Sequence, residues 1–173
     1  MVRKLTEHAG DETGFTFIEL LVVILVIGIL AAVAIPSFLS QTTKAYDASA
    51  KELARTAQTT AVTIGTDHQG SFGNVTATNL LATEPTLVSS SSAANSAWIY
   101  SAAGNNDSYV VTAEAYNTKD LFSIVDNDGT MSRLCGPAAS WSPPAVSSPP
   151  NGSGIGTVTV SSYTGGGCVN GTW

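Results

Sequence analysis

The first apolar stretch of the chain runs from Phe15 to Ile35 with almost no polar interruption. In these 21 residues only Thr16, Glu19 and Gly28 are neither strongly apolar nor Ala. Because a helix rises about 1.5 Å per residue, the run predicts a helix of about 31 Å, which matches the hydrocarbon core of a bilayer. The segment is therefore long and apolar enough to span a membrane.

Beyond Pro36 the apolar residues recur at intervals of three, four or seven, which is typical of one face of an amphipathic helix. This face consists of Leu39, Tyr46, Ala50, Leu53, Ala57, Ala61 and Ile64. The remaining surface carries Lys44, Asp47, Lys51, Glu52 and Arg55, with Asp47 and Lys51 at the favourable spacing of four. We expect the helix to end at about Ile64, where Gly65 stops it. The packing of one subunit cannot bury so long a helix, so its first half needs lipid or other subunits around it.

From Trp98 onward the period of the pattern drops to two, which is typical of β-strands. The segment Asp126-Asn127-Asp128-Gly129 favours a hairpin turn because its residues tolerate positive φ. The predicted strands are 98–100, 109–115, 121–125 and 130–135. We expect an antiparallel meander packed on the exposed half of the long helix, which is an α+β fold.

The segments on either side of these strands are predicted to be mainly loops. Residues 65–97 are rich in Ser, Thr and Gly, with a short helix expected at Thr78–Ala82. Within them Ser89–Ser92 is interpreted as a plain solvated loop, with a glycosylated flexible stretch as the alternative. Residues 136–173 hold five of the seven prolines, and Gly154–Ser162 is predicted to add an edge strand.

Charge and cysteine content narrow the class of protein. The net charge is −6, so the phosphates of a nucleic acid would be repelled and direct nucleic-acid binding is not expected. No histidine lies near Cys135 or Cys168 to complete a metal set. A disulfide between them is the simplest interpretation, with two separate buried thiols as the alternative. The bond requires an oxidising compartment, which agrees with export across a membrane.

The sequence Gly14-Phe15-Thr16-Phe17-Ile18-Glu19-Leu20-Leu21 closely resembles the processing site of type IV prepilins and pseudopilins. A secretory signal peptide would instead carry its cleavage site after the apolar run. The resemblance implies that a prepilin peptidase cuts between Gly14 and Phe15 and that the new amine of Phe15 is methylated. Removing 14 of the 173 residues leaves 159.

The same resemblance implies the pilin fold, a long N-terminal helix packed against a small antiparallel sheet. It divides the chain into a leader at 1–14, a transmembrane and assembly half of the helix at 15–38 and an amphipathic half at 39–64. A connecting region follows at 65–97, and a sheet head with a C-terminal disulfide loop at 98–173. In pilins such a loop is exposed and often meets neighbouring heads.

Glu19 is unusual in this apolar run, because placing an ionised carboxylate in hydrocarbon costs a few kcal/mol even on the lowest of the transfer scales. In one interpretation it lies near the interface and reaches toward water. The family resemblance implies another: Glu19 pairs with the amine of Phe15 on a neighbouring subunit, which neutralises both charges and sets the axial register. A buried pair of this kind supports specificity more than stability.

Gly28 and Pro36 are the positions at which the long helix is expected to be weakest. Pro36 cannot donate to the carbonyl of Ala32, and its ring crowds that turn, so the helix should kink or loosen there. Both positions match places where assembled members of the family often lose helical structure. The alternative is a rigid, gently kinked helix.

The motifs of enzymes are missing from the sequence. It has two histidines and no Ser-His-Asp order, HExxH, P-loop or GxGxxG, so we expect no enzymatic activity and no cofactor. The acidic segment at residue 126 is interpreted as a turn, because the downstream Glu of an EF-hand is absent. Since some pseudopilins bind calcium in a head loop, a calcium site on Asp120, Asp126 and Asp128 is the alternative.

The leading functional expectation is a structural subunit of a type IV pilus or related filament. The precursor is expected to reside in the cytoplasmic membrane as a single-pass protein, and the filament to be extracellular. Its expected partners are other copies of itself, prepilin peptidase, and the pilus assembly platform with its ATPase. The alternatives are a major pseudopilin of a type II secretion or DNA-uptake system, and a membrane-anchored binding module that does not polymerise.

Overall fold

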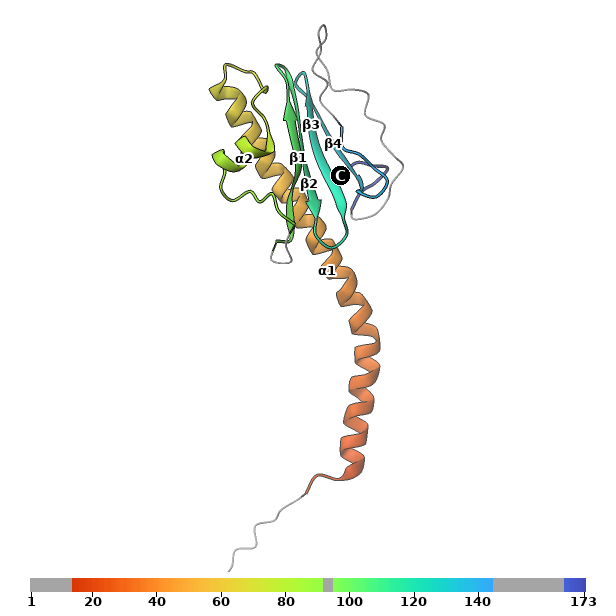
Figure 1. Ribbon diagram of the computed structural model, residues 1–173. Helices are drawn as coiled ribbons and strands as arrows, with labels where there is room; N and C mark the ends of the chain where they lie inside the picture. Colours follow the sequence, from red (N-terminus) through yellow and green to blue (C-terminus); the bar gives the residue numbers. More distant parts are fainter. Residues whose placement is uncertain (1–13, 92–94, 145–166) are drawn as a thin grey trace, which may run out of the picture. The chain divides into compact units, whose positions relative to one another are not determined.

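The computed structural model describes residues 14–91, 95–144 and 167–173. The chain divides into two compact units, Met1–Leu39 and Ser40–Trp173. Helix α1 (Phe17–Asp67) contributes to both units, and a short helix α2 (Ala77–Thr83) belongs to the second (Figure 1). The predicted short helix is thus confirmed.

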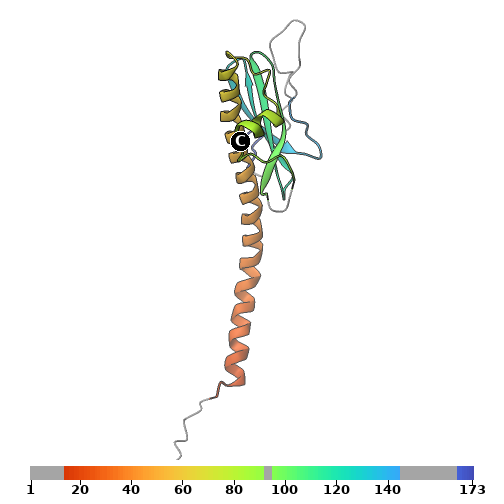
Figure 2. The ribbon, with the colours of Figure 1, turned by 60° about the vertical axis from the view of Figure 1, so that its left-hand side comes forward.

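Four antiparallel strands form one sheet in the order β1-β2-β3-β4, which confirms the predicted α+β meander (Figures 1 and 2). The strands are β1 (Ala97–Gly104), β2 (Ser108–Ala115), β3 (Asp120–Asn127) and β4 (Thr130–Pro137). The register shifts between Ile99 and Ser101, which leaves Tyr100 as a bulge residue with half of its surface exposed. Asp128 and Gly129 close the last hairpin with positive φ of 51° and 79°, as the turn chemistry predicts.

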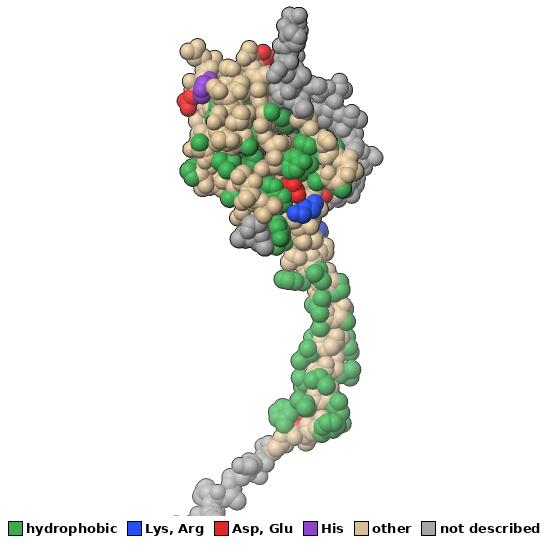
Figure 3. Space-filling model, viewed as in Figure 1, with side chains coloured by type: hydrophobic (Ala, Val, Ile, Leu, Met, Phe, Trp, Pro, Cys, Tyr) green, Lys and Arg blue, Asp and Glu red, His purple; other side chains and the backbone are tan. Residues whose placement is uncertain are grey.

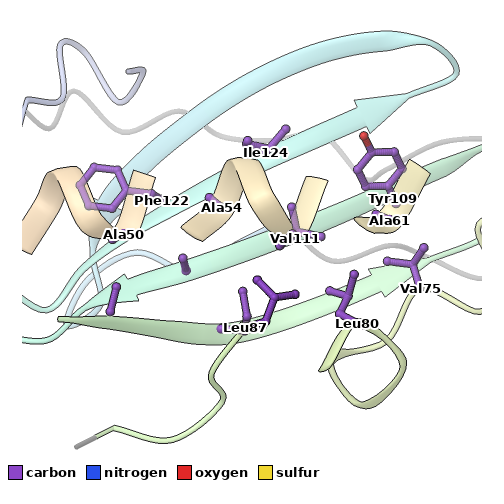
Figure 4. Packing of buried hydrophobic residues seen from close by; sticks show 14 of the residues in the cluster. Ala50, Ala54, Ala61, Val75, Leu80, Leu87, Tyr109, Val111, Phe122 and Ile124 are labelled. Carbon is purple, nitrogen blue, oxygen red and sulfur yellow. The ribbon is translucent and has the colours of Figure 1, made fainter. Parts of the chain in front are cut away.

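The second half of α1 packs on one face of the sheet through small side chains. Ala50, Ala54, Ala57 and Ala61 are fully buried against large residues of β2 and β3 such as Tyr109 and Phe122 (Figure 4). Alternate positions of β2 and β3 supply this face because successive side chains of a strand point to opposite sides. The predicted face of the helix is correct at Ala50, Ala57, Ala61 and Ile64. Tyr46 and Leu53 are only partly buried, and Leu39 is exposed, contrary to the prediction.

Asp47 departs from the predicted pattern. It was expected on the charged, solvent-facing side of the helix, but it is only 3% exposed. Its Oδ1 accepts a hydrogen bond from the hydroxyl of Thr118 in the β2–β3 turn. The spacing of four between Asp47 and Lys51 therefore produces no exposed ion pair, and Lys51 Nζ donates instead to the carbonyl of Gly167.

The end of α1 also differs from the prediction. Gly65 does not stop the helix, which continues to Asp67. The stop is supplied by Gln69, which adopts a positive φ of 60°, and by Gly70, whose N–H donates to the carbonyl of Gly65 at 2.8 Å. These are the features of a Schellman cap. Gly65 instead makes room for Phe72, because a Cβ there would lie 2.5 Å from the ring of Phe72.

The opposite face of the sheet carries a second apolar core. Its buried members are Val110, Leu121, Val125, Leu134 and Trp141. Consequently β2 is buried along its whole length and β3 along most of it. The sequence pattern predicted cover on one face of the sheet only. The segment Gly154–Ser162, where an edge strand was expected, lies outside the described residues, as do Ser92 and the leader up to residue 13.

Candidate processing and assembly site

The predicted processing site lies immediately before α1. Gly14 and Phe15 are both exposed, and Phe15 keeps 82% of its surface accessible. A Cβ added to Gly14 would meet no heavy atom within 4 Å. Among the described residues, none therefore blocks the approach of another molecule to the peptide bond between Gly14 and Phe15.

Thr16 and Glu19 form a reciprocal cap at the start of the helix. The N–H and the hydroxyl of Thr16 donate to Glu19 Oε2 at 2.9 and 2.7 Å, and the N–H of Glu19 is 3.3 Å from Thr16 Oγ1. This is a capping box, which satisfies donors that the first turn of a helix leaves open. Sequence reasoning missed it, although the pattern Thr-x-x-Glu is the signal for it.

The capping box changes the physical account of Glu19. The expectation was a carboxylate that reaches water or the amine of a neighbour. In the single chain, one carboxylate oxygen is already held by the same helix, so the side chain is oriented before any partner arrives. Pairing of Glu19 with the Phe15 amine of another subunit stays a prediction.

The first half of α1 exposes its apolar surface on all sides. Nearly every residue from 15 to 39 is exposed, including all the large apolar ones (Figure 3). An 18-residue window of the helix reaches a mean hydropathy of 3.1, and none of it is buried. Length and composition alone do not distinguish a membrane span from a signal sequence. The distinction therefore depends on the motif at the start of the helix.

Gly28 and Pro36 do not interrupt the helix. Both lie inside the continuous helical span Phe17–Asp67. The single chain therefore has no break at Pro36, because one missing N–H removes only one hydrogen bond and the neighbouring turns retain theirs, while a kink or loosening there stays a prediction. Loss of helical structure between Gly28 and Pro36 in an assembled filament stays a prediction.

The predicted disulfide is confirmed. Cys135 on β4 is bonded to Cys168, with 6.1 Å between their Cα atoms and 33 residues of sequence separation. Its surroundings hold the chain end in place: the indole N–H of Trp173 donates to the carbonyl of Leu134 at 3.0 Å, and its ring meets Phe122 edge to face. The alternative of two separate thiols is thereby excluded.

The three carboxylates of the alternative calcium site, Asp120, Asp126 and Asp128, do not lie together. Asp120 begins β3, whereas Asp126 lies six residues further along the same strand, a span of about 20 Å. The carboxylate of Asp126 accepts a hydrogen bond from the N–H of Gly129 and so supports the turn, as the favoured interpretation predicts. Among the residues that the structure describes, no group of three or more His, Cys, Asp or Glu could hold a metal ion.

Two buried carboxylates in the second unit have unusual surroundings. Burial raises the pKa of Asp47, and the nearby Asp120 adds to this, while the Thr118 hydroxyl and Lys51 oppose it. Burial also raises the pKa of Glu114, against the opposing effect of Lys119, whose Nζ lies 3.7 Å away. Lys119 is itself stacked above the rings of Trp98 and Tyr116, at 4.7 and 4.8 Å from their centroids. In both cases the folded state therefore favours the protonated carboxyl.

Comparison with known proteins identifies the N-terminal segment. Residues 11–35 match the family model of the prokaryotic N-terminal methylation motif. The match contains Gly14, Phe15 and Glu19 and most of the exposed apolar helix. Neither the curated proteins nor the solved structures contain a significant match to the chain.

Proposed function

Because the chain carries the N-terminal methylation motif of type IV pilins and pseudopilins ahead of a pilin-like α+β fold, we propose that it is a filament subunit. The single observation that carries this proposal is an apolar helix, bearing that motif, whose surface the chain does not bury. A bilayer can surround the helix in the precursor. In a filament, the helices of other copies take the place of lipid.

Processing between Gly14 and Phe15 prepares the subunit for this transfer. The cut releases a charged leader and creates an amine one residue before the capping box. Glu19, already oriented by Thr16, then presents its carboxylate to the amine of a neighbouring copy. Matching the two charges removes the cost of leaving either one unpaired in an apolar environment.

Three variants separate processing from assembly. We expect Gly14→Val to block cleavage, because a branched side chain occupies the residue next to the bond that is cut. Glu19→Ala should be cleaved normally and yield few filaments. Glu19→Gln is the matched control, because it keeps the side-chain length and can keep the hydrogen bonds with Thr16 but cannot neutralise an amine.

The measurements are intact mass of the membrane-bound protein and electron microscopy of material sheared from the cells. The proposal expects thin filaments built from the 159-residue form. Assembly of Glu19→Gln at the wild-type level would contradict the charge-pairing role. Wild-type protein that keeps its leader and stays monomeric would favour the anchored binding module instead.

A type IV pilus and the pseudopilus of a secretion or DNA-uptake system require the same processing and the same helix. The buried disulfide fits both, since each exposes the head to an oxidising compartment. We propose the pilus as the first candidate and the pseudopilus as the second. Filament length in the native cell distinguishes them, because pseudopili remain short.

A further inference from the structure

Three aromatic rings and a lysine lie together where α1 first packs against the sheet. The ring centroid of Tyr46 on α1 lies 6.4 Å from that of Tyr116, and the ring of Trp98 meets Tyr116 edge to face at 6.1 Å. Lys119 Nζ lies 4.7 Å above the ring of Trp98 and 4.8 Å above that of Tyr116. We refer to Tyr46, Trp98, Tyr116 and Lys119 as the aromatic group.

The aromatic group belongs to the end of the sheet that is nearest to the start of the second unit. This unit begins at Ser40, and Asp47 is the first residue of α1 that is buried in it. The hydroxyl of Thr118 donates to Asp47, so the β2–β3 turn packs against this first buried part of the helix. No other turn of the sheet is tied by a described hydrogen bond so early on α1.

The apolar surface of α1 ends shortly before the aromatic group. Phe38 and Leu39 still keep 69% and 60% of their surface exposed, and only polar residues follow at 40–43. The twenty residues from Leu20 to Leu39 form a helix of about 30 Å, which equals the thickness of the hydrocarbon core. Leu39 therefore marks the boundary at which the helix leaves hydrocarbon.

This boundary places two side chains of the second unit at the level of the lipid headgroups. Lys44 and Tyr46 follow Leu39 by five and seven residues, which is a rise of about 7.5 and 10.5 Å along the helix. Helical side chains tilt toward the N-terminus of their helix, here toward the bilayer, and they shorten these distances further. The headgroup layer is about 5 to 7 Å thick, so the tips of both side chains reach it.

The chemistry of these side chains fits a headgroup layer. Tyr and Trp are enriched at membrane interfaces, because their rings are apolar and one end of each forms hydrogen bonds with water. Lys44 is exposed, and in the described part of the chain no carboxylate oxygen lies within 4.0 Å of its ammonium. Lys119 is already paired with Glu114, so Lys44 is the cation to which a lipid phosphate is attracted.

We propose that Lys44 and the aromatic group lie in the headgroup layer of the bilayer while the subunit is stored in the membrane. This inference rests on the membrane storage in the proposed function and adds a surface of the second unit to it. The partner is an anionic lipid headgroup, whose phosphate meets the ammonium and whose glycerol region meets the rings. Extraction of a subunit into a filament then breaks these contacts in addition to removing the apolar helix from lipid.

The first test compares the distance of two tryptophans from the headgroups. The full-length chain is reconstituted in vesicles of equal parts phosphatidylcholine and phosphatidylglycerol that contain a lipid with a nitroxide quencher on its headgroup. One variant keeps only Trp98 (Trp141→Phe/Trp173→Phe), and the other keeps only Trp173 (Trp98→Phe/Trp141→Phe). We expect a loss of fluorescence for Trp98 and none for Trp173, which lies beside Arg55, nine residues beyond Tyr46 on α1. Equal quenching of both would overturn the proposal.

The second test measures the contribution of Lys44 in the chain that keeps only Trp98. Lys44→Gln should lower the ratio of quenched to unquenched Trp98 by up to about five-fold, which is the contribution of one lysine near an anionic surface. Arg55→Gln is the matched control, since it removes the same charge at an exposed position of α1 further from the boundary. Its ratio should equal that of the parent chain. Equal ratios in Lys44→Gln and Arg55→Gln would contradict the role of Lys44.

Hydrogen exchange of the unsubstituted chain provides the same comparison without changing any tryptophan. The amides of residues 116–119 should exchange more slowly in the anionic vesicles than in vesicles of phosphatidylcholine alone, whereas those of residues 130–133 on β4 should not change. The same rates in both kinds of vesicle would overturn the proposal.

The outcomes distinguish this inference from the proposed function. A chain that does not incorporate into vesicles removes membrane storage and this inference together. A chain that incorporates and forms filaments in cells, but whose Trp98 is not quenched, overturns only the contact with the headgroups.

Discussion

Phe72 lies against two glycines, Gly65 and Gly104. We predict that shortening the Phe72 side chain relieves an alanine substitution at Gly65 but not one at Gly104. A Cβ at Gly104 would lie 2.1 Å from the carbonyl oxygen of Phe72, and a Cβ at Gly65 would lie 2.5 Å from its ring. Ordinary contact begins near 3.4 Å, so Gly104→Ala requires a shift of about 1.3 Å between two backbone segments. Overpacking of this severity costs about 3 kcal/mol. For a unit of this size that lowers the midpoint of thermal unfolding by roughly 10 °C.

Gly65→Ala should be milder because a ring can move and because Ala favours a helix over Gly by about 1 kcal/mol. The decisive variants combine each change with Phe72→Ala. Removing the ring eliminates the clash at Gly65, so Phe72→Ala/Gly65→Ala should be more stable than Phe72→Ala alone by about 1 kcal/mol. The carbonyl and Cβ of residue 72 remain, so Gly104→Ala should still cost about 3 kcal/mol in the Phe72→Ala background.

The assay is thermal unfolding of the processed chain in detergent micelles, followed by near-ultraviolet circular dichroism. The four single and double variants are compared with Phe72→Ala and the wild type. If Phe72→Ala relieved both glycine substitutions equally, the clash at Gly104 would involve the ring rather than the backbone, and the reasoning would be refuted.

Three further predictions concern the cap, a buried carboxylate and the disulfide. Thr16→Ala should weaken the first turn of α1 by about 1 kcal/mol and reduce filament recovery, whereas Thr16→Ser should retain both. Burial raises the pKa of Glu114 in the folded state above its ordinary value of 4.5, so the folded state binds this proton more readily than the unfolded state. The contribution of Glu114 to the free energy of unfolding is therefore present at low pH and is lost as the pH rises above 4.5. The midpoint of Glu114→Gln should accordingly rise relative to the wild type between pH 4 and 7, and a relative fall would contradict this. Replacing Cys135 and Cys168 by Ser opens the closed loop and should cost about 3 to 4 kcal/mol in urea unfolding, with no effect on cleavage of the leader.

The sequence was sufficient to predict those elements whose stability depends on a pattern of neighbouring residues. Apolar periodicity gave the long helix and the four strands, because burial of one face drives both. The disulfide followed from two cysteines in an exported chain. The Asp128-Gly129 turn followed from residues that accept positive φ.

The remaining features depend on contacts between segments that are distant in the sequence. Asp47 is buried because Thr118, 71 residues away, supplies a hydrogen bond to its carboxylate. Gly65 is small because Phe72 returns against it, and this cannot be read from the helical pattern. The second core behind β2 and β3 needed the position of Trp141, which lies in an irregular segment.

The candidate site was predictable in its residues and less so in its geometry. The motif around Gly14 identified Phe15 and Glu19, because a short recognition sequence carries that information locally. The capping box is equally local, since the pattern Thr-x-x-Glu at residues 16–19 is its signal. The approach of Lys51, Arg55 and Arg133 to the ring of Trp173 combines three segments of the chain and had no signal in the sequence.

The hydrogen bonds that begin α1 have a consequence for maturation. The three bonds of the capping box join Thr16 to Glu19, and none of them uses an atom of Gly14. A peptidase that removes the leader therefore leaves the first turn wound as it was, with no need to refold in the bilayer. Cleavage would then change the charges before the helix without changing the hydrogen bonds of the capping box.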